Sequence, residues 1–180
     1  MDGRGGGGIL LAIRSILDSL LVHIPILGLL ELICVKISLS SHALFVALCY
    51  IPPSSSFKVY QLLIDAIISI NDMLSPVDNL VVLGDFNLPH LTWAQSEEST
   101  HLCTSNASSR VEVEVIDNFK VCNLEQISPD LNSMSRQFDL VFSSDPVNCT
   151  VAPCSQVLCN IDVYHPPLFT LCTPPRFLYY

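Results

Sequence analysis

The chain has 180 residues, of which 50% are hydrophobic and 14% are charged. This composition allows one domain with a hydrophobic core and excludes an intrinsically disordered chain. The formal net charge is −9, with only eight lysines and arginines and no basic run, so a broad basic surface for phosphate backbones is excluded too. Contact with a nucleic acid would have to be local, or assisted by a cation that offsets the carboxylates.

The first half of the chain mixes predicted strands with one helix. A glycine-rich start, residues 5–8, precedes a short apolar run at residues 9–14 that we predict to be a buried strand. Residues 30–37 and 42–50 flank a polar turn and therefore predict a hairpin. Serines then offer an N-cap to residues 57–73, where apolar side chains recur at helical spacing.

The second half adds further strands and a second helix. Residues 79–86 form a nearly continuous apolar run, which is typical of a strand covered on both faces. A polar loop at 95–109 leads into an amphipathic helix at 111–122, and short strands are predicted at 138–142 and within 162–171. Because strands outnumber helices and hairpins mix with helical crossovers, we predict an α+β or α/β sandwich of two sheets with helices outside.

The longest apolar stretch, residues 16–34, raises the question of a membrane span. Four residues that a bilayer-spanning helix tolerates badly interrupt it: Asp18, His23, Pro25 and Glu31. The glycines near the start also do not fit a signal peptide. We therefore predict an intracellular protein, cytoplasmic or nuclear, without a membrane partner and with no obligate protein partner evident.

The eight cysteines are predicted to be free thiols. Cys34, Cys49 and Cys122 lie in apolar segments, where a free cysteine behaves as a small hydrophobic residue. A second group is evenly spaced: Cys149, Cys154 and Cys159. Since no Cys-x-x-Cys pair occurs, zinc binding is weakly supported, and a cysteine-rich binding protein stays an alternative.

Two polar residues end the apolar run at 79–86. Asp85 and Asn87 are two apart, so in an extended strand their side chains point to the same face. The carboxyl end of a buried strand is where such folds bind ligands. A carboxylate there can position or deprotonate a water, and the amide can donate to a phosphate oxygen. The alternative is a turn in which Asp85 bonds to its own backbone.

A histidine beside prolines, His165, is the second candidate for chemistry. Histidine is suited to proton transfer near neutral pH, and Asp139 on a neighbouring predicted strand could fix its tautomer. A histidine at this position could equally be a surface or capping residue, and Asp139 a capped strand carboxylate.

Taken in chain order, these segments resemble the endonuclease/exonuclease/phosphatase superfamily, whose fold is DNase I-like. The motifs are Tyr50-Ile51-Pro52-Pro53, Gly84-Asp85-Phe86-Asn87, Phe138-Asp139-Leu140-Val141-Phe142 and Tyr164-His165-Pro166. The resemblance is above all to endonuclease domains of animal non-LTR retrotransposons, where phrases such as GDFNLPHLTW and YHPPL are characteristic. It sets the expected domain at residues 5–172, with tails at 1–4 and 173–180.

The resemblance implies a four-layer α-β-β-α sandwich, incomplete at the N-terminus, and a DNA phosphodiesterase that uses Mg²⁺ or Mn²⁺. By the same resemblance, Asp85 positions or activates the attacking water and Asn87 holds the scissile phosphate. His165 binds a phosphate oxygen or passes a proton and is oriented by Asp139. Tyr50 lines the same site with its hydroxyl, unless it is a strand-end aromatic of the core.

Two departures from the family pattern concern the metal. The family's metal-binding glutamate, and an asparagine ahead of it, are absent from this sequence. Tyr164 stands where the wider family usually has an aspartate, and Asp162 is a candidate substitute. We therefore expect an endonuclease-type domain of weak or absent activity. The alternatives are a catalytically dead remnant and an unrelated membrane-associated or cysteine-rich binding protein.

Overall fold

The computed structural model describes residues 8–25, 30–95, 102–104, 106–129, 137–154 and 165–173. The predicted hairpin is present in it. β2 (Glu31–Ser38) and β3 (Ala43–Tyr50) pair antiparallel along their whole length. Leu39 N–H donates to His42 O at 2.9 Å and closes the turn. Buried and half-buried residues alternate along β3, because successive side chains point to opposite faces of a sheet.

A helical crossover joins β3 to the next central strand. α1 (Phe57–Asn71) begins after its N-cap, Ser56, and β4 (Asn79–Asp85) then pairs parallel to β3. The predicted helical spacing produces one buried face on α1: Tyr60, Leu63, Ile64, Ala66, Ile67 and Ile70. Burying one large aliphatic side chain contributes about 1.5–3 kcal/mol, so α1 is held mainly by this face.

The central sheet has eight strands in the order β1-β2-β3-β4-β8-β7-β6-β5. Its outer strands are short: β1 (Ser19–Leu21), β7 (Glu125–Gln126), β6 (Leu102–Cys103) and β5 (Ala94–Gln95). β8 (Asp139–Ser143) pairs antiparallel to β4. α2 (Arg110–Val121) starts with a capping box, in which Ser109 accepts from the Glu112 backbone and the Glu112 carboxylate accepts from the Ser109 backbone.

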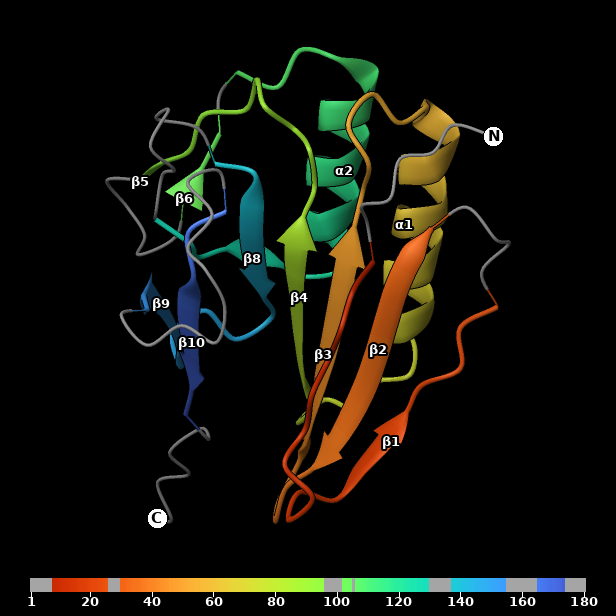
Figure 1. Cartoon of the computed structure of the whole chain (residues 1–180), viewed down its shortest axis with the longest axis vertical. Helices are drawn as coiled ribbons and strands as arrows, with labels where there is room; N and C mark the ends of the chain where they lie inside the picture. Colours follow the sequence, from red (N-terminus) through yellow and green to blue (C-terminus); the bar gives the residue numbers. More distant parts are fainter. Residues whose placement is uncertain are drawn as a thin grey trace.

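The two faces of the central sheet carry different layers. Leu80 and Val82 belong to the main core with residues of both helices, and Figure 1 shows α1 and α2 on the same side of the sheet. Val81 and Val141, which alternate with main-core residues, pack instead against a two-stranded sheet. Its antiparallel strands are β9 (Cys149–Pro153) and β10 (Leu168–Cys172). The described residues thus form a helical layer, a large sheet and a small second sheet.

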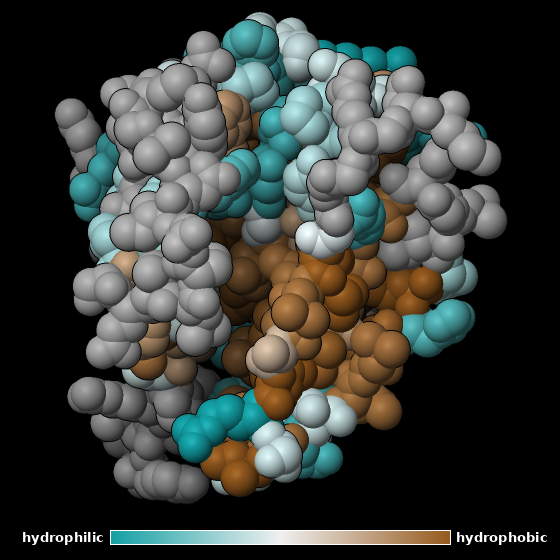
Figure 2. Space-filling view, viewed as in Figure 1, coloured by the Kyte–Doolittle hydropathy of each residue, from teal (hydrophilic) through white to brown (hydrophobic). Residues whose placement is uncertain are grey.

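The side of the sheet opposite the helices shows a continuous hydrophobic area in Figure 2. The exposed large apolar side chains include Leu10 and Ile16 of the N-terminal segment, at 87% and 78% exposure. Leu20 and Leu21 of β1 are 68% and 67% exposed. The mixed α and β class and the sheets are as predicted, whereas the complete four-layer sandwich remains a prediction.

Two sequence interpretations need revision. The predicted strand at residues 9–14 is wrong, because this segment pairs with no strand among the described residues, and Leu10 is 87% exposed. The predicted loop at 95–109 contains β6 and the end of β5. Cys34, Cys49 and Cys122 are buried free thiols, as predicted. In the described part of the chain no helix is long and apolar enough to span a bilayer.

Candidate functional site

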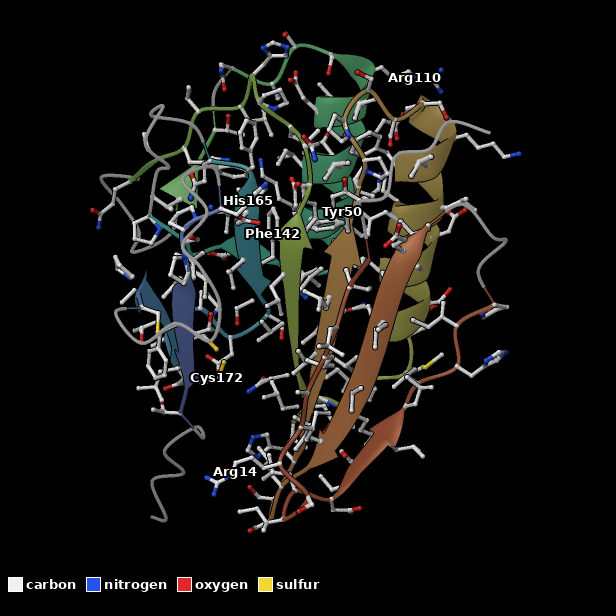
Figure 3. All side chains as sticks on the ribbon, viewed as in Figure 1. Arg14, Tyr50, Arg110, Phe142, His165 and Cys172 are labelled. Atoms are coloured by element: carbon white, nitrogen blue, oxygen red, sulfur yellow. The ribbon has the colours of Figure 1, made fainter. Side chains whose placement is uncertain are left out.

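Three neighbouring strands bring three of the predicted site residues into one row. In the parallel ladder Tyr50 of β3 is the register partner of Asp85 of β4. In the antiparallel ladder Asp85 is the partner of Asp139 at the start of β8. Directly paired residues project from the same face of a sheet. The three side chains therefore lie side by side on one face, where β3 and β4 end and β8 begins. Figure 3 places Tyr50 at the end of β3 and His165 on the β4–β8 side.

Gly84 allows β4 to lie close to β3 just before the site. Its φ is +143°, and a Cβ added there would lie 1.8 Å from the Cys49 carbonyl oxygen. Only glycine combines this backbone conformation with so close an approach. Gly84 therefore determines the position of Asp85 at the end of β4, next to Tyr50.

Asp85 is held by the residue two positions later. Its Oδ1 accepts from the Asn87 backbone N–H at 3.0 Å, and its Oδ2 accepts from Asn87 Nδ2 at 2.8 Å. The Asp85 side chain is only 11% exposed. Burial raises the pKa of Asp85, and the negative charge of Asp139 adds to this, although the bonds from Asn87 and the proximity of His165 act the other way. The carboxylate is consequently a stronger base than an exposed aspartate.

Asn87 bonds to two other parts of the site, and it is also the candidate phosphate-binding residue. It has a positive φ of 46°, which asparagine tolerates better than most residues. Its Nδ2 donates to Ile51 O and to Asp85 Oδ2, both at 2.8 Å. Both amide hydrogens are thus used within the protein. Donation to a phosphate oxygen, the role that the resemblance implies, requires one of these two bonds to be exchanged.

His165 lies between the two carboxylates. Its Nδ1 is 2.9 Å from Asp139 Oδ2, and its Nε2 is 3.9 Å from Asp85 Oδ2. A hydrogen bond from Nδ1–H to Asp139 fixes the tautomer and turns Nε2 toward Asp85. The His165 side chain is 41% exposed, compared with 11% for Asp85, so the imidazole meets solvent while Asp85 lies beneath it. This arrangement can accept, relay and donate a proton at one point.

Tyr60 supports the site and was not singled out from the sequence. Its hydroxyl, on the buried face of α1, donates to the carbonyl oxygens of Phe86 at 3.0 Å and Asn87 at 3.2 Å. These bonds fix the chain where it leaves β4. A tyrosine within an otherwise apolar helix face was the available signal, since a buried hydroxyl requires a partner.

The described residues do not form a complete metal centre. Asp85 and Asp139 offer carboxylate oxygens, the ligands that Mg²⁺ prefers, but Mg²⁺ demands a nearly octahedral set. Among the described ranges no group of three or more His, Cys, Asp or Glu residues is placed to hold a metal ion. Both Asp85 oxygens already accept bonds from Asn87. Asp162 and Tyr164 lie outside the described residues.

Comparison with known proteins relates this site to nucleases. A family model described as endonuclease-reverse transcriptase matches residues 44–168, a range that includes every predicted site residue. No curated protein matches the chain. The structure is similar to the endonuclease domain of TRAS1, a telomere-specific non-LTR retrotransposon, with a TM-score of 0.55 and 14% identity over 87% of this chain and 67% of that one.

Two bacterial structures are less similar. Beta toxin from Staphylococcus aureus has a TM-score of 0.40 and 11% identity, covering 77% of this chain and 52% of that chain. An endonuclease/exonuclease/phosphatase family protein from Leptotrichia buccalis has a TM-score of 0.34 and 12% identity, covering 67% and 44%. The chain therefore spans about half of these proteins. The TRAS1 likeness shows the predicted DNase I-like fold.

Proposed function

Because the chain belongs to the endonuclease-reverse transcriptase family, we propose that it is a retrotransposon-type endonuclease domain that cleaves phosphodiester bonds of DNA. The observation that supports this proposal best is that Asp85 and Asp139 lie at adjacent strand ends and that His165 approaches both, with its ring nitrogens 3.9 Å and 2.9 Å from the two carboxylates. These residues are separated in sequence by up to 80 positions in the printed numbering, so their meeting is a property of the fold.

The proposed chemistry is in-line hydrolysis. Asp85 takes a proton from the attacking water while the new P–O bond forms, and its raised pKa suits it to act as a base. In its protonated form, with Nδ1–H donated to Asp139, His165 binds a non-bridging phosphate oxygen through Nε2–H or gives this second proton to the leaving alcohol oxygen as the old P–O bond breaks. Asp139 keeps the imidazole in position for this transfer. Tyr50 contributes a contact to the phosphate, and Asn87 would do so by exchanging one of its two internal hydrogen bonds.

We further propose that activity is weak or absent in this chain. Support comes from two observations within the described residues: the carboxylates fall short of a metal-binding set, and the Asn87 amide is occupied by internal bonds. The resemblance implies that Mg²⁺ or Mn²⁺ serves the family by neutralising phosphate charge, which is worth several kcal/mol of transition-state stabilisation. A catalytically dead remnant with the same fold is the second candidate function, and the same two observations favour it.

A supercoiled-plasmid nicking assay with Mg²⁺ or Mn²⁺ distinguishes the two candidates. Asp85→Asn and His165→Ala should each abolish nicking by the purified chain. Asp65→Asn is the matched control, because it makes the same chemical change on the exposed side of α1. Nicking that survives in Asp85→Asn would refute the proposed role. Absence of nicking in the unaltered chain at any cation concentration would establish the remnant.

A further inference from the structure

Two cysteines face each other across the small second sheet. Cys149 is the first residue of β9 and Cys172 the last residue of β10, and they are direct partners in the antiparallel register. Their sulfur atoms are 2.7 Å apart. Because the strands already bring the sulfurs together, a covalent link between them needs no rearrangement of the backbone.

The surroundings of the pair distinguish its two members. Cys149 is buried at 4% exposure in the cluster with Val81 and Val141, whereas Cys172 is half-buried at the rim. In the neutral pair Cys149 Sγ donates to Cys172 Sγ. When Cys149 is deprotonated, Cys172 donates to the thiolate instead, and Ser143 provides a further hydrogen bond. The bond from Cys172 lowers the pKa of Cys149 below the ordinary thiol value, against the opposing effects of burial and of the nearby Asp145 charge. Cys149 is thus stabilised as a thiolate, the reactive form of cysteine.

Other buried cysteines of the chain have the opposite character. Burial raises the pKa of Cys34 to about 12 and also raises the pKa values of Cys49 and Cys122. These three lie in the apolar core as neutral thiols and are predicted to be inert. Among these five cysteines, only Cys149 combines a stabilised thiolate with a second sulfur in contact, that of Cys172.

We propose that Cys149 and Cys172 form an oxidation site that reacts with small hydroperoxides and closes a disulfide between β9 and β10. In the first step the Cys149 thiolate attacks one peroxide oxygen, the O–O bond breaks, and Cys149 becomes a sulfenic acid while hydroxide or an alkoxide leaves. In the second step Cys172 sulfur attacks Cys149 sulfur, the S–O bond breaks, and water leaves with the Cys172 proton. The peroxide is reduced by two electrons and the two thiols are oxidised by two.

The link would close at the end of the β9–β10 ladder away from the candidate nuclease site and would use none of its residues. β10 begins at Leu168, three positions after His165 in the printed sequence, and its register partner Pro153 ends β9. A disulfide at the far end of this ladder would fasten β10 to β9. The proposal concerns a chemical modification and stands whether or not the domain cleaves DNA.

Peptide mapping after peroxide treatment tests this site in the full chain. A protease that cleaves before aspartate separates residues 145–161, which contain Cys149, Cys154 and Cys159, from residues 162–180, which contain Cys172. After a brief exposure to hydrogen peroxide and alkylation of remaining thiols, the two fragments should appear joined, with the loss of two hydrogen atoms. Fragmentation should locate the link at Cys149, and the joined species should disappear on reduction.

Cysteine variants make the assignment specific. Cys149→Ser and Cys172→Ser should each eliminate the joined fragments, whereas the matched control Cys154→Ser should form them at the unaltered rate. The rate of closure should rise with pH around a midpoint below the ordinary thiol value of 9.0, because the contact with Cys172 lowers the pKa of Cys149 against the opposing effects of burial and of the Asp145 charge. A link through Cys154 or Cys159, or separate fragments at a dose that oxidises the exposed Cys103, would overturn the proposal. Equal yields from urea-unfolded chain would overturn it too, because proximity in the fold would then be irrelevant.

Discussion

Gly84 offers a sharp test of how β3 and β4 support the site. In Gly84→Ala the new Cβ would meet backbone, namely the Cys49 carbonyl oxygen at 1.8 Å and carbon at 2.8 Å, so no side-chain rotation can relieve the contact. Holding alanine at a φ of +143° costs about 1–3 kcal/mol. Separating the strands costs a further amount of about 1–3 kcal/mol for overpacking, with about 1 kcal/mol for each weakened ladder hydrogen bond. We expect a loss of roughly 3–6 kcal/mol, a large share of a typical domain's stability.

Urea unfolding followed by the fluorescence of Trp93, the single tryptophan, measures this loss. Gly8→Ala is the matched control, because Gly8 also has a positive φ, +126°, but a Cβ there meets nothing within 4 Å. If Gly84→Ala shifts the unfolding midpoint no more than Gly8→Ala does, the close approach of the two strands is not what requires glycine, and the reasoning fails.

Three further changes test the carboxylates and the tyrosine. Asp139→Asn removes the charge that orients His165 and should lower any plasmid-nicking rate on the order of 10²-fold. Tyr60→Phe removes the hydroxyl that bonds two carbonyls after β4 and should lower the urea-derived free energy of unfolding by about 1–2 kcal/mol. Burial alone would raise the pKa of Asp78, but bonds from two backbone N–H groups outweigh it and lower the pKa. Its stabilisation should therefore be complete above the ordinary value of 3.8 and be lost as the pH falls through the lower folded-state value, a loss absent in Asp78→Asn melts.

Each of these changes has its own control or contrary result. Asp65→Asn, on the exposed side of α1, should leave nicking unchanged, and a similar loss there would remove the case for Asp139. An unfolding midpoint for Tyr60→Phe equal to that of the unaltered chain would mean that its hydroxyl bonds are energetically neutral. If Asp78→Asn loses as much unfolding free energy at acid pH as the unaltered chain does, Asp78 is excluded as the titrating group.

The central elements could be predicted because each has a long, regular apolar pattern. The hairpin, α1, β4 and α2 follow the predicted periodicities to within a few residues at each end. β5, β6 and β7 could not be predicted, since two residues are too few to show an alternation. The strand predicted at residues 9–14 rested on apolar composition alone. A run of hydrophobic residues becomes a strand only when its backbone can hydrogen-bond to a neighbouring strand.

The proximity of the site residues was predictable, and their hydrogen bonding less so. The motifs indicated that Asp139 orients His165, and the two lie 2.9 Å apart. The internal bonds of Asn87 depend on its positive φ and on the carbonyl of Ile51, a residue 36 positions earlier. Local sequence does not encode such a long-range backbone contact, and the same holds for the Tyr60 hydroxyl.

The electrostatics of Tyr50, Asp85, Asp139 and His165 indicate what these proton-transfer groups would need in order to bind a phosphodiester. Asp85 and Asp139 are directly opposite in the ladder, and like charges so placed destabilise a sheet. Even with His165 protonated, three groups carry a net single negative charge, and the whole chain carries −9. A phosphodiester, itself an anion, is repelled from such a site unless a cation offsets the carboxylates. Because these carboxylates need a cation to offset them, we infer that any nicking should require Mg²⁺, and nicking at an unchanged rate in the presence of a chelator would show that charge is not what limits the rate.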